Sequence, residues 1–563
     1  MLALLASLLT AVALAAEPDL ILAHGKVFLG PGRYAQAVAV EGGRIKAVGA
    51  DSVVLALKGA KTRVVDLKGR TVTPGFHDAH THFVKGALLM TQVDLNGTSS
   101  LAEVQAKVAR YAAENSTAAW ILGRGWDQTS WPGGAYPTAA DLDVAVTTRP
   151  AALTDADGHK LWLNTEAMRR ITLHAHNPNL VEGQYLKGAD GEPSGVFMDE
   201  TMAYVFKYVP APSREQKLTG LRKALALARE NGVTAIDSMQ GPVDYSPEEQ
   251  VSLWRELSKN GEMTLRYFLY GRIDDPAGFA KLKKSAADVP RDHLDFIGLK
   301  AFVDGTIGDR TAALLAPYFD DAKTSGSLKH SDSSLAAMVE RAHRDGFQVA
   351  FHAVGDRAVR QALDACEKSE KKAKEEERVL PSYPCRVEHI ELVSPEDLPR
   401  FAALRAAASM QPSHMTYDRE DENYNPNRLG ARVKWAFAWK SLEDAGALLI
   451  FGTDWPVMPL PPRIALFAAT TRRHFDGKPE GGWIPEQKIA LDSAIEHYTA
   501  DAARALGKED QLGSIASGRL ADLVVFDRDL FAASGLDLLK VEVDMTVLEG
   551  KVVYERAAEA PKP

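Results

Sequence analysis

Hydrophobic and polar residues alternate with a period of two in short runs near each end of the chain. These runs are separated by glycine turns and cover residues 20–30, 36–50, 62–72, 518–529 and 543–555. Such a repeat, broken by turns, is typical of an antiparallel β-sheet with one buried face. We therefore expect residues 17–73 and 501–563 to build a single β-sandwich around a central domain.

Between the two ends, short runs of apolar and β-branched residues alternate with helical stretches. Two of the expected helices, at 214–232 and 332–346, end in glycine, as helix C-termini often do. Eight consecutive β/α units close a barrel, so we predict an α/β fold with a (β/α)8 TIM barrel over residues 74–500. The eight strand-like runs span residues 71–80, 232–239, 263–271, 296–305, 347–355, 385–392, 405–413 and 447–457.

One interval, between the first expected strand and its helix, is far longer than an ordinary connection. It runs from Thr91 to Pro212 and is rich in tryptophan, glycine and proline. A segment of this length inside a compact domain usually has structure of its own and often carries function. We predict an inserted subdomain at residues 91–212 that forms a lid over the barrel mouth.

The first sixteen residues are apolar and uncharged and end in small residues. They are too short to span a bilayer and are typical of a signal peptide, so we expect a periplasmic or secreted protein. No lysine or arginine precedes the apolar run, which leaves a wrongly chosen start codon or a buried first strand as alternatives. No other long apolar run follows, so no membrane association is expected after cleavage.

The net charge of −9 and the pI near 6.0 describe a mildly acidic surface. Such a surface repels phosphate backbones, so we expect no nucleic-acid partner. The sequence does not fix the oligomeric state, and a homo-oligomer stays open. The two cysteines, Cys366 and Cys385, could form a disulfide in an oxidising compartment or could be two unpaired small hydrophobes.

Two histidines one residue apart, His80 and His82, follow a Pro-Gly pair in the first expected barrel strand. Regular strand alternation would turn these two side chains and Asp78 to one face, and His77 to the other. Two imidazoles at this spacing can chelate one metal ion, although the pair alone could also be structural.

Other candidate ligands end separate strands. His352, His389 and Asp454 lie at the carboxyl ends of the fifth, sixth and eighth expected strands. Because these ends converge on one mouth of a barrel, a shared metal site is favoured over isolated core histidines.

Lys300 lies near the end of the fourth expected strand, where an ordinary lysine would bury a cation beside metal ions. If its amine carries CO₂ as a carbamate, it becomes an anionic ligand that can bridge two ions. The alternative is a lysine that reaches solvent or pairs with Asp304.

These residues resemble the metal set of the amidohydrolase superfamily. Longer motifs are similar to its YtcJ-like branch, which includes N-substituted formamide deformylases, and together they extend over nearly the whole mature chain. The motifs occupy residues 141–168, 300–318, 351–359, 386–401, 409–414 and 513–527.

The resemblance implies one or two divalent ions, with zinc expected, and a set of ligands for them. It also implies that Asp454 accepts a proton from the attacking water and passes it to the leaving nitrogen. His77 departs from the family pattern, which usually has an apolar residue there, and is not counted as a ligand. The implied ligands are His80, His82 and Asp454 for one ion, His352 and His389 for the second, and N6-carboxylated Lys300 between them.

The resemblance therefore implies a metal-dependent amidohydrolase that hydrolyses a C–N bond, in an amide, N-formyl or N-acyl linkage, of a small molecule. A deaminase of a ring amidine and a non-catalytic binding protein of the same fold are the alternatives, the latter disfavoured because all six ligand positions hold suitable chemistry. Each candidate substrate contact could instead have a structural role. These candidates are His159, Trp126, Asp304, Arg310, Gln411 and His414, with Trp131 near Trp126.

Overall fold

The structure, a computed structural model of the chain, describes residues 17–156, 158–241, 245–417 and 425–557. The predicted leader, residues 1–16, lies outside the described residues. The chain divides into two compact units: Met1–His82 together with Leu225–Pro563, and Phe83–Ala224.

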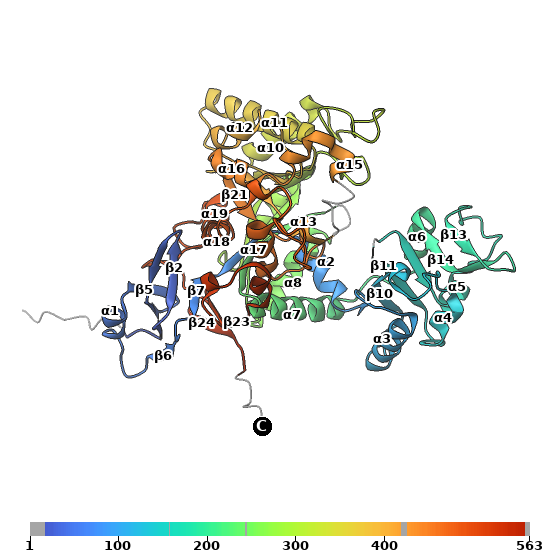
Figure 1. Ribbon diagram of the computed structural model, residues 1–563, viewed down its shortest axis with the longest axis horizontal. Coiled ribbons are helices and arrows are strands. Elements are labelled where there is room, and N and C mark those ends of the chain that lie inside the picture. The colour runs from blue at the N-terminus through green and yellow to red at the C-terminus, as the bar shows by residue number, and fades with distance from the viewer. Residues whose placement is uncertain (1–16, 157, 242–244, 418–424, 558–563) are drawn as a thin grey trace, which may run out of the picture. The chain divides into compact units, whose positions relative to one another are not determined.

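The first unit contains a β-sandwich to which both ends of the chain contribute, as predicted. One sheet has the order β5-β4-β1-β6 and the other β24-β23-β22-β7-β2-β3, in which β22 pairs with β7. In Figure 1 the blue strands β2 and β7 accordingly belong to one sheet with the red strands β23 and β24. The strands are β1 (Leu20–Ala23), β2 (Lys26–Gly30), β3 (Arg33–Ala35), β4 (Ala37–Glu41), β5 (Arg44–Gly49), β6 (Arg63–Asp66), β7 (Thr71–Pro74), β22 (Leu523–Phe526), β23 (Val543–Leu548) and β24 (Lys551–Glu555).

The alternating pattern at the termini buries one face of each sheet against the other. Leu22 and Val40 from the first sheet share a core cluster with Val72, Leu523 and Val547 from the second. Burial of these apolar side chains holds the two ends of the chain together.

All eight predicted barrel strands are present and parallel, in the order β21-β20-β19-β18-β17-β16-β15-β8. They are buried almost throughout, which explains their nearly continuous apolar runs. The strands are β8 (Phe76–Thr81), β15 (Val233–Met239), β16 (Arg266–Arg272), β17 (Leu294–Phe302), β18 (Gln348–Ala353), β19 (Cys385–His389), β20 (Ala406–Met410) and β21 (Leu448–Phe451).

The predicted helices at 214–232 and 332–346 correspond to α7 and α10, and Gly232 and Gly346 beyond their ends have positive φ angles of 74° and 77°. A left-handed residue after a helix end suits glycine, so the sequence signal was correct. The longer helices that alternate with the strands, and the three that follow β21, are α7 (Arg214–Glu230), α8 (Pro247–Lys259), α9 (Pro276–Ser285), α10 (Asp332–Arg344), α11 (Asp356–Glu375), α17 (Pro462–Thr471), α18 (Leu491–His497) and α19 (Ala500–Ala505).

The two edge strands of the barrel sheet meet just beyond the end of β21. The amide of Asp454 donates to the carbonyl of His80 at 2.7 Å, and the amide of His82 donates to the carbonyl of Trp455 at 2.7 Å. A β-bridge joins Thr81 to Trp455. These contacts bring the histidine pair of the first strand next to the aspartate that follows the eighth.

The second unit, Phe83–Ala224, is somewhat wider than the predicted insertion at 91–212. It contains a six-stranded sheet of order β13-β14-β12-β11-β10-β9, with hydrophobic clusters that include Val104 and Trp162 in one case and Leu161 and Phe197 in the other. It therefore has cores of its own, and its role as a lid stays a prediction. Its elements are α2 (Phe83–Leu89), β9 (Val93–Asp94), α3 (Leu101–Glu114), β10 (Ile121–Trp126), α4 (Ala139–Asp143), β11 (Ala151–Asp155), β12 (Lys160–Leu163), α5 (Thr165–Ile171), β13 (Tyr185–Lys187), β14 (Pro193–Met198) and α6 (Asp199–Phe206).

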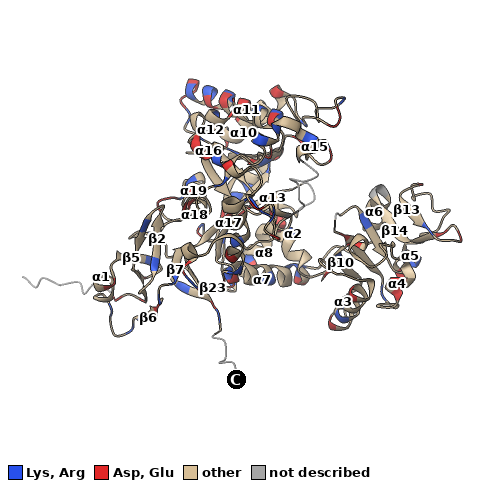
Figure 2. Cartoon of the chain, in the orientation of Figure 1, with Lys and Arg blue, Asp and Glu red and all other residues tan. Residues whose placement is uncertain are grey.

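The surface helix α11 carries basic and acidic residues interspersed along its length, so it forms no stripe of one charge (Figure 2). Its other face is buried and includes Cys366, which forms a disulfide with Cys385 at the start of β19. Of the two alternatives for the cysteines, the structure shows the paired one. In the described part of the chain, no helix is long and apolar enough to cross a membrane.

Candidate metal centre

The six side chains predicted as metal ligands gather at the carboxyl ends of the barrel strands. Oδ1 of Asp454 lies 3.3 Å from Nε2 of His82 and 3.6 Å from Nε2 of His80. One ligand atom from each of these three residues falls within 4.8 Å of the others, a spacing that fits one shared metal ion.

Asp454 is buried, and its Oδ1 atom accepts no hydrogen bond in the described part of the structure. Burial opposes the charge of this carboxylate, but His80 and His82 outweigh that effect and hold its pKa well below the usual range. An ionised oxygen that is buried without a hydrogen bond and faces two imidazole nitrogens is what a metal ligand requires.

The ring of His80 is fixed by a carboxylate on its far side. Its Nδ1 atom lies 2.7 Å from Oε2 of Glu388, which directs Nε2 toward Asp454. Burial, with a contribution from Lys300, lowers the pKa of His80 to about 4. The imidazole is therefore neutral at neutral pH and can offer the Nε2 lone pair to a metal ion.

Glu388 belongs to a buried charge network centred on Arg386, which is fully buried inside the barrel. The guanidinium donates to Glu388 on its own strand and to Asp237 on β15, both at 2.5 Å. It also donates to the carbonyl of Ala79 on β8 and to the hydroxyl of Ser409 on β20 at 3.0 Å. Its Nη1 atom also donates to the hydroxyl of Tyr270 on β16 at 3.2 Å, so one side chain ties together five of the eight barrel strands.

His77 reaches the same network, so the prediction that it lies on the opposite strand face from His80 was wrong. Its Nε2 atom is 2.8 Å from Oδ1 of Asp237, while His80 reaches Glu388. The register between β8 and β15 shifts between Asp78 and Thr81, as at a β-bulge, and this extra residue breaks the regular alternation.

Asp78 was predicted to face the same way as His80, but its carboxylate accepts hydrogen bonds from the amide and hydroxyl of Thr453, at 2.9 and 2.5 Å. It therefore anchors the turn before Asp454. Burial raises the pKa of Asp78 to about 7.

His352 and His389 each have one ring nitrogen engaged by the protein. Nε2 of His352 lies 3.0 Å from the carbonyl oxygen of Gly305, and Nδ1 of His389 lies 2.9 Å from Oε1 of Gln411. The His389 ring centroid is 4.7 Å from that of His352 and 4.9 Å from that of His80. Burial lowers the pKa of His352 to about 3 and that of His389 well below its usual value, so both rings are neutral.

Lys300 is buried, with its Nζ atom 3.4 Å from Nε2 of His80. The alternative of a lysine that reaches solvent does not agree with this position.

Two of the predicted substrate contacts lie beside this cluster. Gln411 holds His389, and the ring of His414 stacks on that of His389 with centroids 6.0 Å apart. Nε2 of His414 is 3.7 Å from Oδ2 of Asp454, and its Nδ1 is 3.9 Å from Oε1 of Glu391. In the described structure, Nε2 of Gln411 and Oε2 of Glu391 are buried without a hydrogen bond, which suits contact with a polar ligand.

Asp304 is held by the backbone next to this cluster. It is fully buried, and its carboxylate accepts hydrogen bonds from the amides of Ala313, Val354 and Gly355 at 2.9 to 3.0 Å. Burial raises its pKa to about 7. Asp304 therefore fixes the loop after β18, its Oδ1 atom lies 3.8 Å from Nε2 of His352, and its contact with substrate stays a prediction.

The other predicted contacts have local partners. Arg310 pairs with Asp320 at 2.8 Å. His159 is exposed in the turn between β11 and β12. Trp126 is fully buried in the core of the second unit, 6.2 Å from the ring of Trp131, and its burial favours the packing role that the sequence had left open.

The sequence analysis missed Arg386, Glu388 and Asp237. A signal existed, because β19 reads Cys-Arg-Val-Glu-His, and two opposite charges inside a fully buried strand need partners. Their partners on β8 and β15 could not be identified from one sequence.

The donor set of this centre fits a divalent metal ion. Three neutral imidazoles present one nitrogen each, and a buried carboxylate presents an oxygen without a hydrogen bond, which are the ligand types that zinc prefers.

Comparison with known proteins agrees with this centre. The chain is 30% identical to Protein LONG AFTER FAR-RED 3 of Arabidopsis thaliana, over 95% of this chain and 91% of that protein. It is 27% identical to an N-substituted formamide deformylase of Arthrobacter pascens, over 93% and 95% of the two chains. The crystal structure of an uncharacterized metal-dependent hydrolase from Pyrococcus furiosus matches with a TM-score of 0.72 and 27% identity, covering 91% of this chain and 99% of that one.

A similar identity, 28%, relates the chain to the protein YtcJ of Bacillus subtilis, over 93% of this chain and 97% of that protein. The model of the amidohydrolase family, Amidohydro_3, matches residues 63–554. With the barrel, the β-sandwich and the ligand cluster in place, the chain belongs to the amidohydrolase family.

Proposed function

We propose that this protein hydrolyses a C–N bond of a small molecule, in an amide, N-formyl or N-acyl linkage. The observation that carries the proposal is Asp454, a buried and ionised carboxylate whose Oδ1 atom lies 3.3 Å from Nε2 of His82 and 3.6 Å from Nε2 of His80. The similarity to an N-substituted formamide deformylase over most of both chains supports the choice of bond.

The residues that would hold one ion are His80, His82 and Asp454, and those for a second are His352 and His389. When bound, one or two divalent ions, which we propose to be zinc, polarise the substrate carbonyl and lower the pKa of water. We propose further that Lys300 is carboxylated and lies between the ions, because its Nζ atom is 3.4 Å from His80.

In this proposal Asp454 moves the proton. Its carboxylate accepts a proton from the attacking water as the water oxygen adds to the carbonyl carbon. It then donates that proton to the nitrogen as the C–N bond breaks, so that a carboxylic acid and an amine leave. His414, 3.7 Å from the other carboxylate oxygen, helps to orient it.

The test is metal analysis of the purified protein, combined with a screen of N-formyl and N-acyl amines. We expect bound divalent metal, and release of acid and amine in equal amounts. Asp454→Asn should keep much of the ligand shell yet lose hydrolysis. A metal-loaded protein that turns over no amide would contradict the proposal.

A deaminase is the second candidate, because one 71-residue stretch is 37% identical to a 5-methylthioadenosine/S-adenosylhomocysteine deaminase of Symbiobacterium thermophilum. The stretch covers only 11% of this chain, so it supports this candidate less than the full-length match supports an amidase. Release of ammonia from heterocyclic amidines, without cleavage of N-acyl substrates, would favour the deaminase.

We also propose that the protein is exported. The apolar leader supports this location, as does the buried disulfide between Cys366 and Cys385, because disulfides persist in oxidising compartments. N-terminal sequencing should find a start near Ala16 or Glu17 in the periplasmic or secreted fraction. An intact Met1 on cytoplasmic protein would contradict export.

A further inference from the structure

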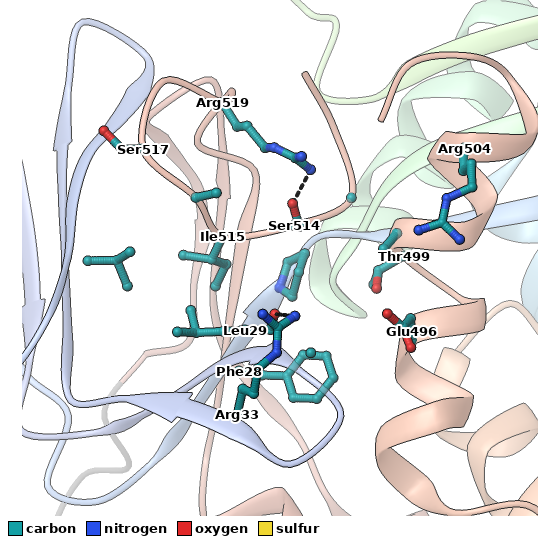
Figure 3. A pocket seen from close by; sticks show the side chains of 16 residues that line it. Phe28, Leu29, Arg33, Glu496, Thr499, Arg504, Ser514, Ile515, Ser517 and Arg519 are labelled. Atoms are coloured by element: carbon teal, nitrogen blue, oxygen red, sulfur yellow. Dashed lines mark hydrogen bonds between the residues drawn. The ribbon is translucent and has the colours of Figure 1, made fainter. Parts of the chain in front are cut away.

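A cavity of about 460 Å³ lies where the β-sandwich meets the last helices of the barrel, away from the metal centre. Pro74 forms part of its walls. The other walls include the β2–β3 hairpin and residues between Glu496 and Arg519, as Figure 3 shows. Pro74 ends β7, just before the amino end of β8, whereas His80 and His82 lie at the carboxyl end of that strand. The strand therefore separates this cavity from the metal centre.

Three arginines line the cavity, opposite a single acidic residue, Glu496. Arg504 is paired with Asp501 at 2.9 Å. Arg33 and Arg519 instead donate to neutral oxygens, the carbonyl of Leu29 at 2.9 Å and the hydroxyl of Ser514.

Across the described residues, no carboxylate lies within ion-pair distance of either Arg33 or Arg519. Burial and the neighbouring Asp501 raise the pKa of Glu496, while Arg504 and Arg33 act in the opposite direction. In a chain of net charge −9, the arginines of this cavity form a local excess of positive charge that faces an open space.

The backbone around the cavity is shaped to admit these groups. Gly30 has a φ angle of +130°, and a Cβ atom at this position would lie 2.5 Å from Nη2 of Arg33. Gly513 has a φ angle of +80°, and a Cβ atom there would lie 2.6 Å from the carbonyl oxygen of Thr499. The first glycine leaves room for the guanidinium, and the second lets the 513–519 loop approach the barrel closely.

The remaining walls are apolar, with Phe28, Leu29, Val48 and Ile515 among them. A volume of this size matches pockets that hold small organic molecules, and guanidinium groups bind carboxylates through paired hydrogen bonds. We propose that the cavity is a second ligand site, which binds a small organic acid. The carboxylate faces Arg33 and Arg519, and the apolar body lies against Phe28 and Ile515.

Because the walls belong to both the β-sandwich and the barrel helices, a bound acid would hold the two together. Ligand that binds only the folded state raises the unfolding temperature. We therefore expect phenylacetate at millimolar concentration to raise the melting temperature of the metal-loaded protein. Acetate, which lacks the apolar body, and 2-phenylethanol, which lacks the charge, should have much smaller effects.

The variant Arg33→Gln/Arg519→Gln distinguishes binding in this cavity from binding at the metal centre, where a carboxylate could also bind. Equilibrium dialysis with labelled phenylacetate should show one equivalent fewer in this variant, or at least a tenfold weaker binding step, while metal content and amide hydrolysis stay unchanged. Arg528→Gln removes an arginine that lies in the same β-sandwich but outside the cavity, and this variant should behave as wild type. If the double variant does not fold, Arg33→Gln alone carries the test, because Arg33 is exposed in a hairpin.

Two results would overturn the proposal. One is a double variant that binds phenylacetate as the wild type does, which would assign all binding to the metal centre. The other is an equal response of the wild type to 2-phenylethanol, which would show that the arginines contribute nothing. Neither result depends on which C–N bond the enzyme hydrolyses.

Discussion

Nδ1 of His80 lies 2.7 Å from Oε2 of Glu388, and both side chains are almost fully buried. Arg386 in turn holds Glu388, so the orientation of a predicted metal ligand on the first barrel strand is set by two charges on the sixth. A carboxylate behind a ligating histidine fixes its tautomer and raises its basicity. Glu388 is therefore a positioning residue that acts through His80.

The first prediction concerns this carboxylate. Glu388→Gln keeps the shape of the side chain but removes its negative charge, so the ring of His80 is held less firmly. We expect metal affinity to fall by about 10- to 100-fold, the range seen for such outer contacts. Chelator competition on purified protein measures the change.

A suitable control is Asp397→Asn, because Asp397 is also buried and paired with arginines, Arg360 and Arg400, but away from the centre. It should lower stability and leave metal affinity unchanged. Equal metal affinities for Glu388→Gln and wild type would show that the Glu388 contact is only structural.

The second prediction concerns Arg386 itself. Because Arg386 is buried, no water stabilises the charges of Asp237 and Glu388 beside it. Burial lowers the pKa of the guanidinium, but these two carboxylates outweigh burial and hold that pKa well above its usual value. Arg386→Met would leave two buried negative charges without a partner. Breaking a buried pair in this way lowers the free energy of unfolding by about 3–5 kcal/mol. Urea unfolding of the variant and the wild type measures this loss in the free energy of unfolding.

The matched surface variant is Arg344→Met, whose half-exposed guanidinium pairs with Glu340 and Glu376. Its cost should stay below about 1 kcal/mol, as for exposed ion pairs. Adding Asp237→Asn to Arg386→Met should recover part of the lost stability. Similar costs for the two arginine variants would mean that the buried network contributes little.

The third prediction concerns Lys300. If this lysine is carboxylated between two ions, Lys300→Ala removes their shared ligand, and metal content and turnover should both fall steeply. Formate or acetate supplied in solution should restore part of the activity, because each offers the same pair of oxygens. Retention of full metal content and near-normal turnover would refute the carbamate.

The eight barrel strands, and the gathering of the candidate ligands at one end of them, could be predicted from the sequence because both depend on local pattern. Hydrophobic period marks strands, and the carboxyl ends of barrel strands converge wherever the fold places them. His80, His352, His389 and Asp454 therefore came together as expected, although His80 lies hundreds of residues before the other three.

What could not be predicted depends on pairing between distant residues. The shifted register of β8 turns His77 toward Asp237, and no local sequence pattern predicts such a bulge. Asp304 was predicted from its place after a barrel strand, but no local pattern shows that three backbone amides from other segments donate hydrogen bonds to it. Trp126 looked like a recognition residue, because composition alone does not distinguish an aromatic wall from an aromatic core.

The fourth prediction concerns the second unit. His159 is exposed in its β11–β12 turn and was predicted to contact substrate. If it does, His159→Ala should raise KM with metal content and melting temperature unchanged. His174→Ala, another exposed histidine of this unit, is the control and should leave KM unchanged. Equal KM values for the two variants would remove His159 from the site.

Substitution at Trp126 should have a different effect. Trp126→Ala opens a cavity in the core of the second unit and should cost about 3–5 kcal/mol of its stability. Limited proteolysis should then cut within residues 83–224 while the barrel keeps its metal.

The last prediction concerns pH and His497 in α18. Its Nδ1 atom lies 2.8 Å from Asp501 and its Nε2 atom 3.3 Å from Glu443. Burial disfavours the charged ring, but these two carboxylates outweigh it and raise the pKa of His497 from 6.5 to about 9. The protonated histidine therefore stabilises the folded state fully below pH 6.5, by about 3 kcal/mol, and this contribution disappears as the pH rises through 9. Urea unfolding of wild type and His497→Gln between pH 6 and 10 should give two free energies of unfolding that differ at the acidic end and converge at the alkaline end. A difference that stays constant across this range would show that His497 is neutral in the folded protein.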